Sequence, residues 1–205
     1  MIRYYLESLL IRLRLKHQLS KEASEEYWRS PPDAGNQPMD YATIGHEKDE
    51  KLIEIFHYFN IPHTASILEI GCNAGRNLRA LADDGYNCLS GIDINPDAIE
   101  TCRELKTPAK TVCGEMGEIL PALGTFDVAF STGVLMHVPY REDVYDSIGN
   151  TVKSGGYLIT MEEEKCDIKY FYAKNYGTLF ESRGYDQVYV EELDNSLTLR
   201  VLKKK

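Results

Sequence analysis

Three absences narrow what this 205-residue chain can be. No stretch approaches the roughly 18 apolar residues that a membrane-spanning helix needs. The five cysteines form no Cys-x-x-Cys pair and no Cys/His cluster of zinc-site spacing. Positive charge is not in excess either, because 23 Lys and Arg stand against 32 Asp and Glu, a net charge of −9. The chain is therefore neither a disulfide-rich miniature nor a protein expected to grip nucleic acid.

The N-terminus lacks the features of a secretion signal. Arg12, Arg14 and Lys16 interrupt the apolar run early, and no small-residue cleavage site follows. Together with an odd number of unpaired thiols, this predicts a cytoplasmic protein. Residues 1–21 nevertheless carry five basic residues against Glu7 alone, a local charge of +4 in an otherwise acidic chain.

What is present indicates one globular domain with an N-terminal extension. Hydrophobic residues make up 43% of the chain and charged residues 27%, which is enough material for a full core. Residues 2–15 have the apolar spacing of an amphipathic helix, and residues 29–41 form a connection rich in Pro, Gly, Asp and Asn. We therefore predict a helical extension over residues 1–43 and the main domain over residues 44–205.

Strand and helix patterns alternate through the main domain. Strands are predicted at 66–70, 88–92, 110–113, 126–131, 156–161, 187–192 and 197–202, and helices at 46–60, 77–84, 96–105, 140–152 and 170–183. This order predicts an α/β, Rossmann-like, doubly wound sheet of seven strands. The sheet is expected to be mostly parallel, with an antiparallel last strand in a C-terminal hairpin that turns at Asp194-Asn195. In such sheets ligands bind beyond the carboxyl ends of the strands.

The turns at those strand ends contain the residues that indicate a ligand. Gly71 and Gly75 flank Asn73, a residue that tolerates positive φ, directly after the first strand. Asp93 ends the second strand, where a carboxylate can accept hydrogen bonds from both hydroxyls of a ribose. An ordinary tight turn, and an acid before a helix, are the alternative interpretations of these two features.

Five segments in order resemble the motifs of class I S-adenosylmethionine-dependent methyltransferases. They are ILEIGCNAGRN, GIDINPDAI, CGEM, FDVAFSTGVLMHVP and KSGGYLIT, and the resemblance covers residues 44–202. It implies S-adenosylmethionine as cofactor. NAD is disfavoured, because its G-x-G-x-x-G fingerprint would need glycines where Asn73 and Arg76 stand. Within the family, the motifs weakly resemble small enzymes of surface-sugar biosynthesis.

The resemblance also implies roles for individual residues. Glu69 would bind the methionine ammonium group, and Asp93 the ribose. The other expected cofactor residues are Gly71, Cys72, Asn73 and Gly75 for the methionine part, Ile94, Glu115 and Met116 for the adenine, and Ser131 and Thr132 for the sulfonium region. Met116 equally suits a core position at the start of a helix.

His137, just beyond the fourth strand, is the candidate general base for a hydroxyl acceptor. Its alternative role is to cap a loop or touch the cofactor. Tyr41, Tyr140 and Glu162 are candidate substrate residues. No metal is expected, and Glu162-Glu163-Glu164 is interpreted as a solvated run rather than a magnesium site.

These observations predict O-methylation of a small-molecule or saccharide-type acceptor. The saccharide expectation rests on the placement of the 14 tyrosines, four of which lie within residues 4–41 and eight from residue 140 onward. N-methylation, another methionine-cofactor transfer such as aminopropyl transfer, and a non-catalytic cofactor-binding module remain alternatives. The basic segment 1–21 is expected to be a lid over the cofactor with Tyr27, Trp28 and Tyr41, a peripheral membrane contact, or an oligomer contact. Monomer and homodimer both remain open.

Overall fold

The computed structural model describes residues 2–33, 35–43, 47–193 and 197–205. Its helices are α1 (Ile2–Arg12), α2 (Lys21–Arg29), α3 (Pro38–Thr43), α4 (Glu47–Tyr58), α5 (Arg76–Asp83), α6 (Pro96–Glu104), α7 (Met116–Leu123), η1 (Leu135–His137), α8 (Glu142–Asn150) and α9 (Tyr176–Glu181). Its strands are β1 (Ile67–Ile70), β2 (Leu89–Asp93), β3 (Lys110–Cys113), β4 (Phe126–Thr132), β5 (Val152–Glu163), β6 (Tyr185–Glu192) and β7 (Leu197–Lys204).

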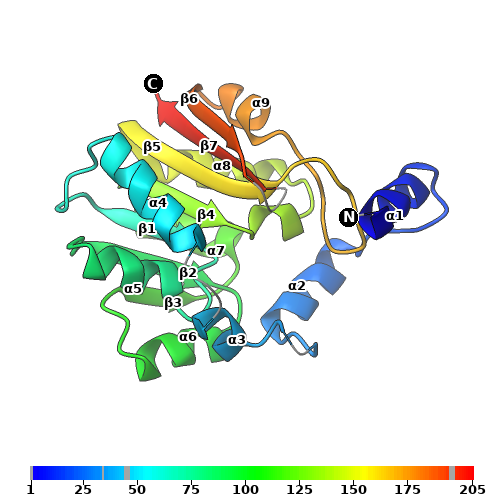
Figure 1. The fold of residues 1–205 in the computed structure, drawn as a ribbon, viewed down its shortest axis with the longest axis horizontal. Coiled ribbons are helices and arrows are strands. Elements are labelled where there is room, and N and C mark those ends of the chain that lie inside the picture. The colour runs from blue at the N-terminus through cyan, green and yellow to red at the C-terminus, as the bar shows by residue number, and fades with distance from the viewer. Residues whose placement is uncertain (1, 34, 44–46, 194–196) are drawn as a thin grey trace.

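The strands form one seven-stranded sheet in the order β3-β2-β1-β4-β5-β7-β6 (Figure 1). Strands β1 to β5 pair parallel with one another, and β7 pairs antiparallel with both β5 and β6. The predicted fold class is confirmed. The expected hairpin turn at Asp194-Asn195 lies outside the described residues.

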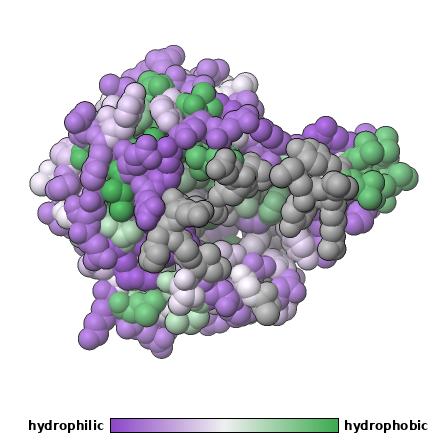
Figure 2. Space-filling view, in the orientation of Figure 1, coloured by the Kyte–Doolittle hydropathy of each residue, from purple (hydrophilic) through white to green (hydrophobic). Residues whose placement is uncertain are grey.

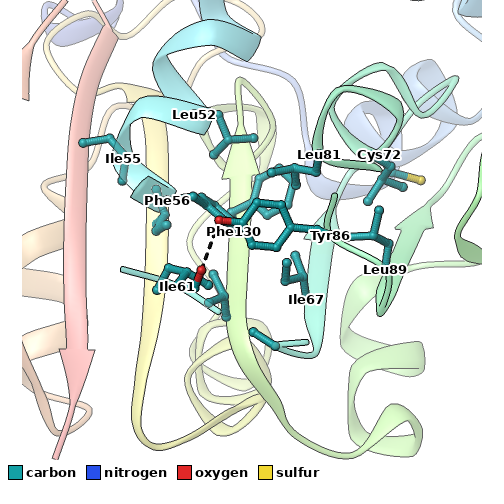
Figure 3. Close-up of a cluster of buried hydrophobic side chains, with 14 of the residues drawn as sticks. Leu52, Ile55, Phe56, Ile61, Ile67, Cys72, Leu81, Tyr86, Leu89 and Phe130 are labelled. Atoms are coloured by element: carbon teal, nitrogen blue, oxygen red, sulfur yellow. Dashed lines mark hydrogen bonds between the residues drawn. The ribbon is translucent and has the colours of Figure 1, made fainter. Parts of the chain in front are cut away.

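Alternating side chains of the strands supply two hydrophobic cores, one on each face of the sheet. Ile67 of β1 belongs to the core that α4, α5 and α6 cover, whereas Leu68 belongs to the core under α7, α8 and α9. In the first core, the ring of Phe56 meets those of Tyr86 and Phe130 edge-on, at centroid distances of 5.2 and 6.1 Å (Figure 3). These cores fix the strand ends and hence the turns that follow them.

Besides α7, which begins at Met116 and which no predicted helix covers, three differences from the predicted elements concern the site. Helix α2 was not predicted, although Ser20 caps it by accepting a hydrogen bond from the Ala23 amide. Helix α3 lies within and beyond the segment predicted as a connection. The helix predicted over 170–183 begins only at Tyr176, because Asn175 is its N-cap and accepts from the Thr178 amide. Residues 164–175 instead form a long connection beside α1 (Figure 1).

Candidate functional site

A cavity opens at the carboxyl ends of β1, β2, β3 and β4, where the fold class predicts a ligand. It encloses about 1200 Å³, its open mouth included. The predicted site residues that line it are Tyr41, Glu69, Gly71, Cys72, Asn73, Asp93, Ile94, Glu115, Met116, Thr132 and His137. Gly75, Ser131, Tyr140 and Glu162 are not among the lining residues.

The turn after β1 is held in an unusual backbone conformation. Gly71 has φ 77° and Asn73 has φ 44°, both in the left-handed region. A Cβ at position 71 would lie 2.4 Å from a methyl carbon of Val134, so only glycine fits. Gly75, with φ 75°, faces protein rather than ligand, because a Cβ there would meet Thr107 and Cys102.

Glu69 is a buried carboxylate with one unsatisfied oxygen. Its Oε1 accepts a hydrogen bond of 2.6 Å from Asn77 Nδ2. Its Oε2 is buried and has no hydrogen-bond partner among the described residues. Burial raises the pKa of Glu69 well above its usual range. A cationic donor entering the cavity would satisfy the free oxygen and favour the ionised form.

Asp93 is held by backbone amides from both sides. Its Oδ2 accepts from the Asn73 amide at 2.7 Å, and its Oδ1 accepts from the Asn95 amide at 2.9 Å. Burial raises the pKa of Asp93, and these amide bonds oppose the shift. Each oxygen keeps a second lone pair for a ligand hydroxyl.

At one end of the cavity, Arg141 links α7 to α2. Glu115 is the N-cap residue of α7, and Met116 begins that helix and also packs against the core. The Arg141 guanidinium lies 3.6 Å from Glu115 and 3.4 Å from Glu25 of α2. We call this arrangement the Arg141 bridge.

Glu162 supports the cavity from beneath rather than facing a substrate. It is fully buried and accepts hydrogen bonds from Ser131 Oγ (2.8 Å), the Val134 amide (3.2 Å) and the Met136 amide (3.1 Å). Burial raises its pKa, and these donors oppose the shift. The Ser131 hydroxyl donates to Glu162 instead of facing the cavity. This contact explains why neither residue lines the cavity.

The expectation of a solvated Glu162–164 run is wrong. Glu163 is 5% exposed, and Glu164 forms a 2.6 Å ion pair with the guanidinium of Arg200. The connection to α9 covers the carboxyl end of β5. The predicted strand pattern gave no indication of this cover.

His137 is enclosed by aromatic rings from two segments. Its ring centroid lies 4.2 Å from that of Trp28 and 5.0 Å from that of Phe171. Nδ1 lies 2.9 Å from the Tyr170 carbonyl oxygen, which can only accept, so Nδ1 carries the proton and Nε2 keeps its lone pair. Burial lowers the pKa of His137 to about 4, so the ring is neutral at pH 7.

Helix α2 forms one wall of the cavity. A cover at this place was predicted from residues 1–21 together with Tyr27, Trp28 and Tyr41. Lys21, Ser24, Glu25 and Trp28 line the cavity, and Ser24 Oγ donates to the His137 carbonyl at 2.9 Å. Tyr41 of α3 completes this wall, whereas Tyr27 is not among the lining residues.

None of residues 6–20 lines the cavity, whereas Lys21 does, and a lid role for the basic segment stays a prediction. Helix α1 lies at a projecting end of the molecule, where Figure 2 shows hydrophobic side chains on the surface. Leu6, Leu9 and Leu13 are each more than half exposed.

The tyrosines that suggested a saccharide lie mostly elsewhere. Tyr145, Tyr176 and Tyr185 are buried in the core, and Tyr140 is exposed and bonds Glu142. Of the described tyrosines, Tyr41 alone lines the cavity. The lining residues that sequence reasoning missed include Ser24 and Arg141, which lie outside every motif, and Arg76, which lies within the first motif.

Comparison with known proteins agrees with this geometry. Residues 68–160 match a family model described as a methyltransferase domain. The chain contains a class I S-adenosylmethionine-dependent methyltransferase domain. The seven-stranded order, with β7 antiparallel, is the sheet of that class.

The curated relatives share only the central part of the chain. A 2-methyl-6-phytyl-1,4-hydroquinone methyltransferase of Synechocystis is 29% identical over 111 residues, which are 52% of this chain and 35% of that protein. A 24-methylenesterol C-methyltransferase 2 of rice (Oryza sativa) is 28% identical over 102 residues, 47% of this chain and 28% of that protein. The matched stretch thus spans about a third of the length of these relatives.

Among solved structures, the magnesium protoporphyrin IX methyltransferase of Synechocystis with bound SAH superposes with a TM-score of 0.68 at 12% identity. That match covers 90% of this chain and all of the other, and at this identity it shows the fold alone. The relatives named here give the resemblance to surface-sugar enzymes no support. Within the described residues, no helix is long and apolar enough to cross a membrane.

Proposed function

We propose that this protein transfers a methyl group from S-adenosylmethionine to a hydroxyl of a small-molecule acceptor. The observation that carries the proposal is the free Oε2 of Glu69, a buried acceptor without a partner among the described residues at the wall of the cavity. A methionine ammonium group is the complement of such an oxygen, whereas the charged ring nitrogen of NAD carries no hydrogen to donate.

The cavity residues fit the rest of this cofactor. We assign the ribose hydroxyls to Asp93, whose two oxygens each keep a lone pair, and the adenine to the apolar side chains of Ile94 and Met116. Glu115 would lie at the adenine edge, and the backbone of Gly71, Cys72 and Asn73 would border the methionine part. When bound, the sulfonium supplies an activated methyl group, so the protein mainly has to align the acceptor and exclude water.

Trp28 and His137 are the residues that we assign to the acceptor. The indole Nε1 of Trp28 is buried without a partner among the described residues, and His137 Nε2 keeps a lone pair. A single hydroxyl can accept a hydrogen bond from the first and donate one to the second. His137 would thereby orient the hydroxyl and take its proton as the oxygen attacks.

We infer the class of acceptor from the side chains that line the cavity beside His137, and not from the number of tyrosines in the chain. Trp28, Val138 and Pro139 offer apolar surface beside His137, which favours an acceptor with a flat or apolar body over a saccharide. The sterol and hydroquinone named in the relatives' descriptions have such bodies, which supports the same choice.

Calorimetric titration of the protein with S-adenosylmethionine and separately with NAD tests the cofactor assignment. Binding of the first alone is expected, and binding of NAD alone would overturn the proposal. A methyl-donor consumption screen over phenols, sterols, amines and sugars then tests the acceptor. Turnover only with amines would establish the N-methylation alternative, and binding without turnover would favour a non-catalytic module.

We also propose a reducing compartment such as the cytoplasm, because all five thiols are free. Contact of α1 with an anionic membrane surface or with a second copy of the chain stays a prediction. The exposed leucines next to Arg12, Arg14 and Lys16 support it.

A further inference from the structure

We propose that His57, His63 and Asp84 bind a divalent metal ion of the zinc class at the edge of the sheet opposite the cavity. His57 lies in the last turn of α4, His63 in the connection from α4 to β1, and Asp84 directly after α5. These segments precede β1 and β2, so they meet at the amino ends of the strands. The three residues each offer a ligand atom, and those atoms lie within 4.8 Å of one another.

The present geometry is close to that of a metal site. His57 Nε2 lies 2.7 Å from Asp84 Oδ2, a hydrogen bond that a metal ion can replace. Zinc bonds of about 2.0–2.2 Å in a tetrahedron place ligand atoms about 3.3 Å apart. The pair therefore has to open by about 0.6 Å. The side chain of His57 is 55% exposed, so it has room to move.

His63 is held in place by its surroundings. Its ring meets the buried ring of Tyr86 edge-on, with centroids 4.7 Å apart. Its carbonyl oxygen accepts from the Asn87 amide at 3.3 Å. A Cβ at Gly85 would lie 3.3 Å from His63 Nδ1, so the glycine leaves room for the imidazole. A ligand fixed in this way loses little conformational entropy when a metal binds.

The donor set selects the metal. Two imidazoles and one carboxylate suit Zn²⁺ or Co²⁺, whereas Mg²⁺ and Ca²⁺ prefer oxygen ligands throughout. Both histidines are exposed, so a water molecule can complete the tetrahedron. The bound ion would tie the end of α4 to the end of α5 and stabilise the folded chain without touching the methyl-transfer site.

The experiment uses Co²⁺ as a spectroscopic probe, on the chelator-treated chain without an affinity tag. Because Cys88 and Cys113 are exposed thiols, both are replaced by Ser in the background protein. One Co²⁺ per chain is expected to give the visible absorption of a tetrahedral site, which Zn²⁺ abolishes by displacement. Zn²⁺ at 100 times its Kd is expected to raise the Tm by about 5–10 °C.

His57→Gln, His63→Gln and Asp84→Asn are each expected to weaken Co²⁺ binding at least tenfold. His17→Gln, which removes an exposed histidine outside the cluster, is the matched control and should bind as the parent does. Unchanged affinity for S-adenosylmethionine in each variant shows that the fold is intact. Equal Co²⁺ binding by the His63→Gln and His17→Gln variants, or no binding at millimolar Co²⁺, would overturn the proposal.

Discussion

At the scale of single residues, Glu69 combines burial with an unused oxygen. Replacing it by Gln removes the charge and leaves the side chain's shape, so we expect the Kd for S-adenosylmethionine to rise about 10- to 100-fold. That range corresponds to the loss of one hydrogen bond to a charged group. Isothermal calorimetry measures it directly, and an unchanged Kd would remove Glu69 from the cofactor site.

The pKa of Glu69 is raised in the parent protein, and this allows a second measurement that compares the parent with the Glu69→Gln variant. An ammonium group beside the carboxylate lowers its pKa, so cofactor binding should release a proton at a pH between the ordinary and the raised value. Calorimetry at a series of pH values, in buffers of different ionisation enthalpy, detects this release. The Glu69→Gln protein should show less of it, and equal release from both proteins would assign the proton to another group.

His137→Asn tests the proposed base. Asparagine can still donate to the Tyr170 carbonyl through its amide, but it lacks the lone pair of Nε2. We expect kcat to fall at least about 100-fold while the Kd for S-adenosylmethionine stays the same. In the parent, kcat/KM should show no loss from His137 protonation between pH 8 and pH 5.5, because its pKa is about 4. Full activity of the variant would leave His137 a structural role only.

The motif residues were predictable because local backbone rules govern them. Gly71 and Asn73 belong to a tight turn, and Asp93 ends a strand. Both features depend on residues only a few positions away in the sequence. Ser24 and Arg141 were not predictable, because Ser24 bonds His137, 113 residues on, and Arg141 reaches Glu25 across 116 residues. Glu162 was predicted to contact the substrate because the strand pattern does not reveal its hydrogen-bond donors. These are the Ser131 hydroxyl near the end of β4 and two amides of the loop that follows.

At the scale of elements, contacts of Ser24, Trp28 and Glu25 hold α2 over the cavity, and the Arg141 bridge is one of these contacts. Arg141→Gln should loosen α2 and raise the Kd for S-adenosylmethionine about two- to fivefold, the worth of a partly exposed ion pair. Trp28 is the chain's single tryptophan, so its fluorescence reports this helix alone. We expect stronger quenching by acrylamide in the variant.

Arg103→Gln is the control for the bridge. Arg103 pairs with Glu100 on the exposed side of α6, away from the cavity. It should leave both the Kd and the quenching of Trp28 unchanged. If both variants behave like the parent, the position of α2 does not depend on the bridge.

The helices and strands of the domain were predictable where the spacing of apolar residues alone determines them. The strands lie close to their predicted places, because apolar runs between breakers are buried by helices on both faces. The predicted helix at 170–183 starts at Tyr176 because the preceding residues are fixed by distant contacts, such as that of the Tyr172 hydroxyl with the Leu19 carbonyl. Periodicity does not encode such contacts.

At the scale of the whole molecule, burial of His137 couples the site to the stability of the fold. The pKa of His137 is lowered from 6.5 to about 4 in the folded state, so on acidification the unfolded chain binds a proton before the folded one does. Stability from this group is present above pH 6.5 and is lost as the pH falls towards 4. The loss between pH 7 and pH 5 amounts to about 2 kcal/mol.

Urea unfolding of the parent and of His137→Asn at both pH values isolates that contribution. Glu69, Asp93 and Glu162 have raised pKa values and contribute in the opposite direction, but they are common to both proteins and cancel in the difference. The parent should therefore lose about 2 kcal/mol more than the variant between pH 7 and pH 5. An equal loss would mean that His137 takes up a proton as readily in the folded chain as in the unfolded one. In that case His137 would be partly charged at pH 6, and the rate supported by the proposed base would fall as the pH drops through about 6.5.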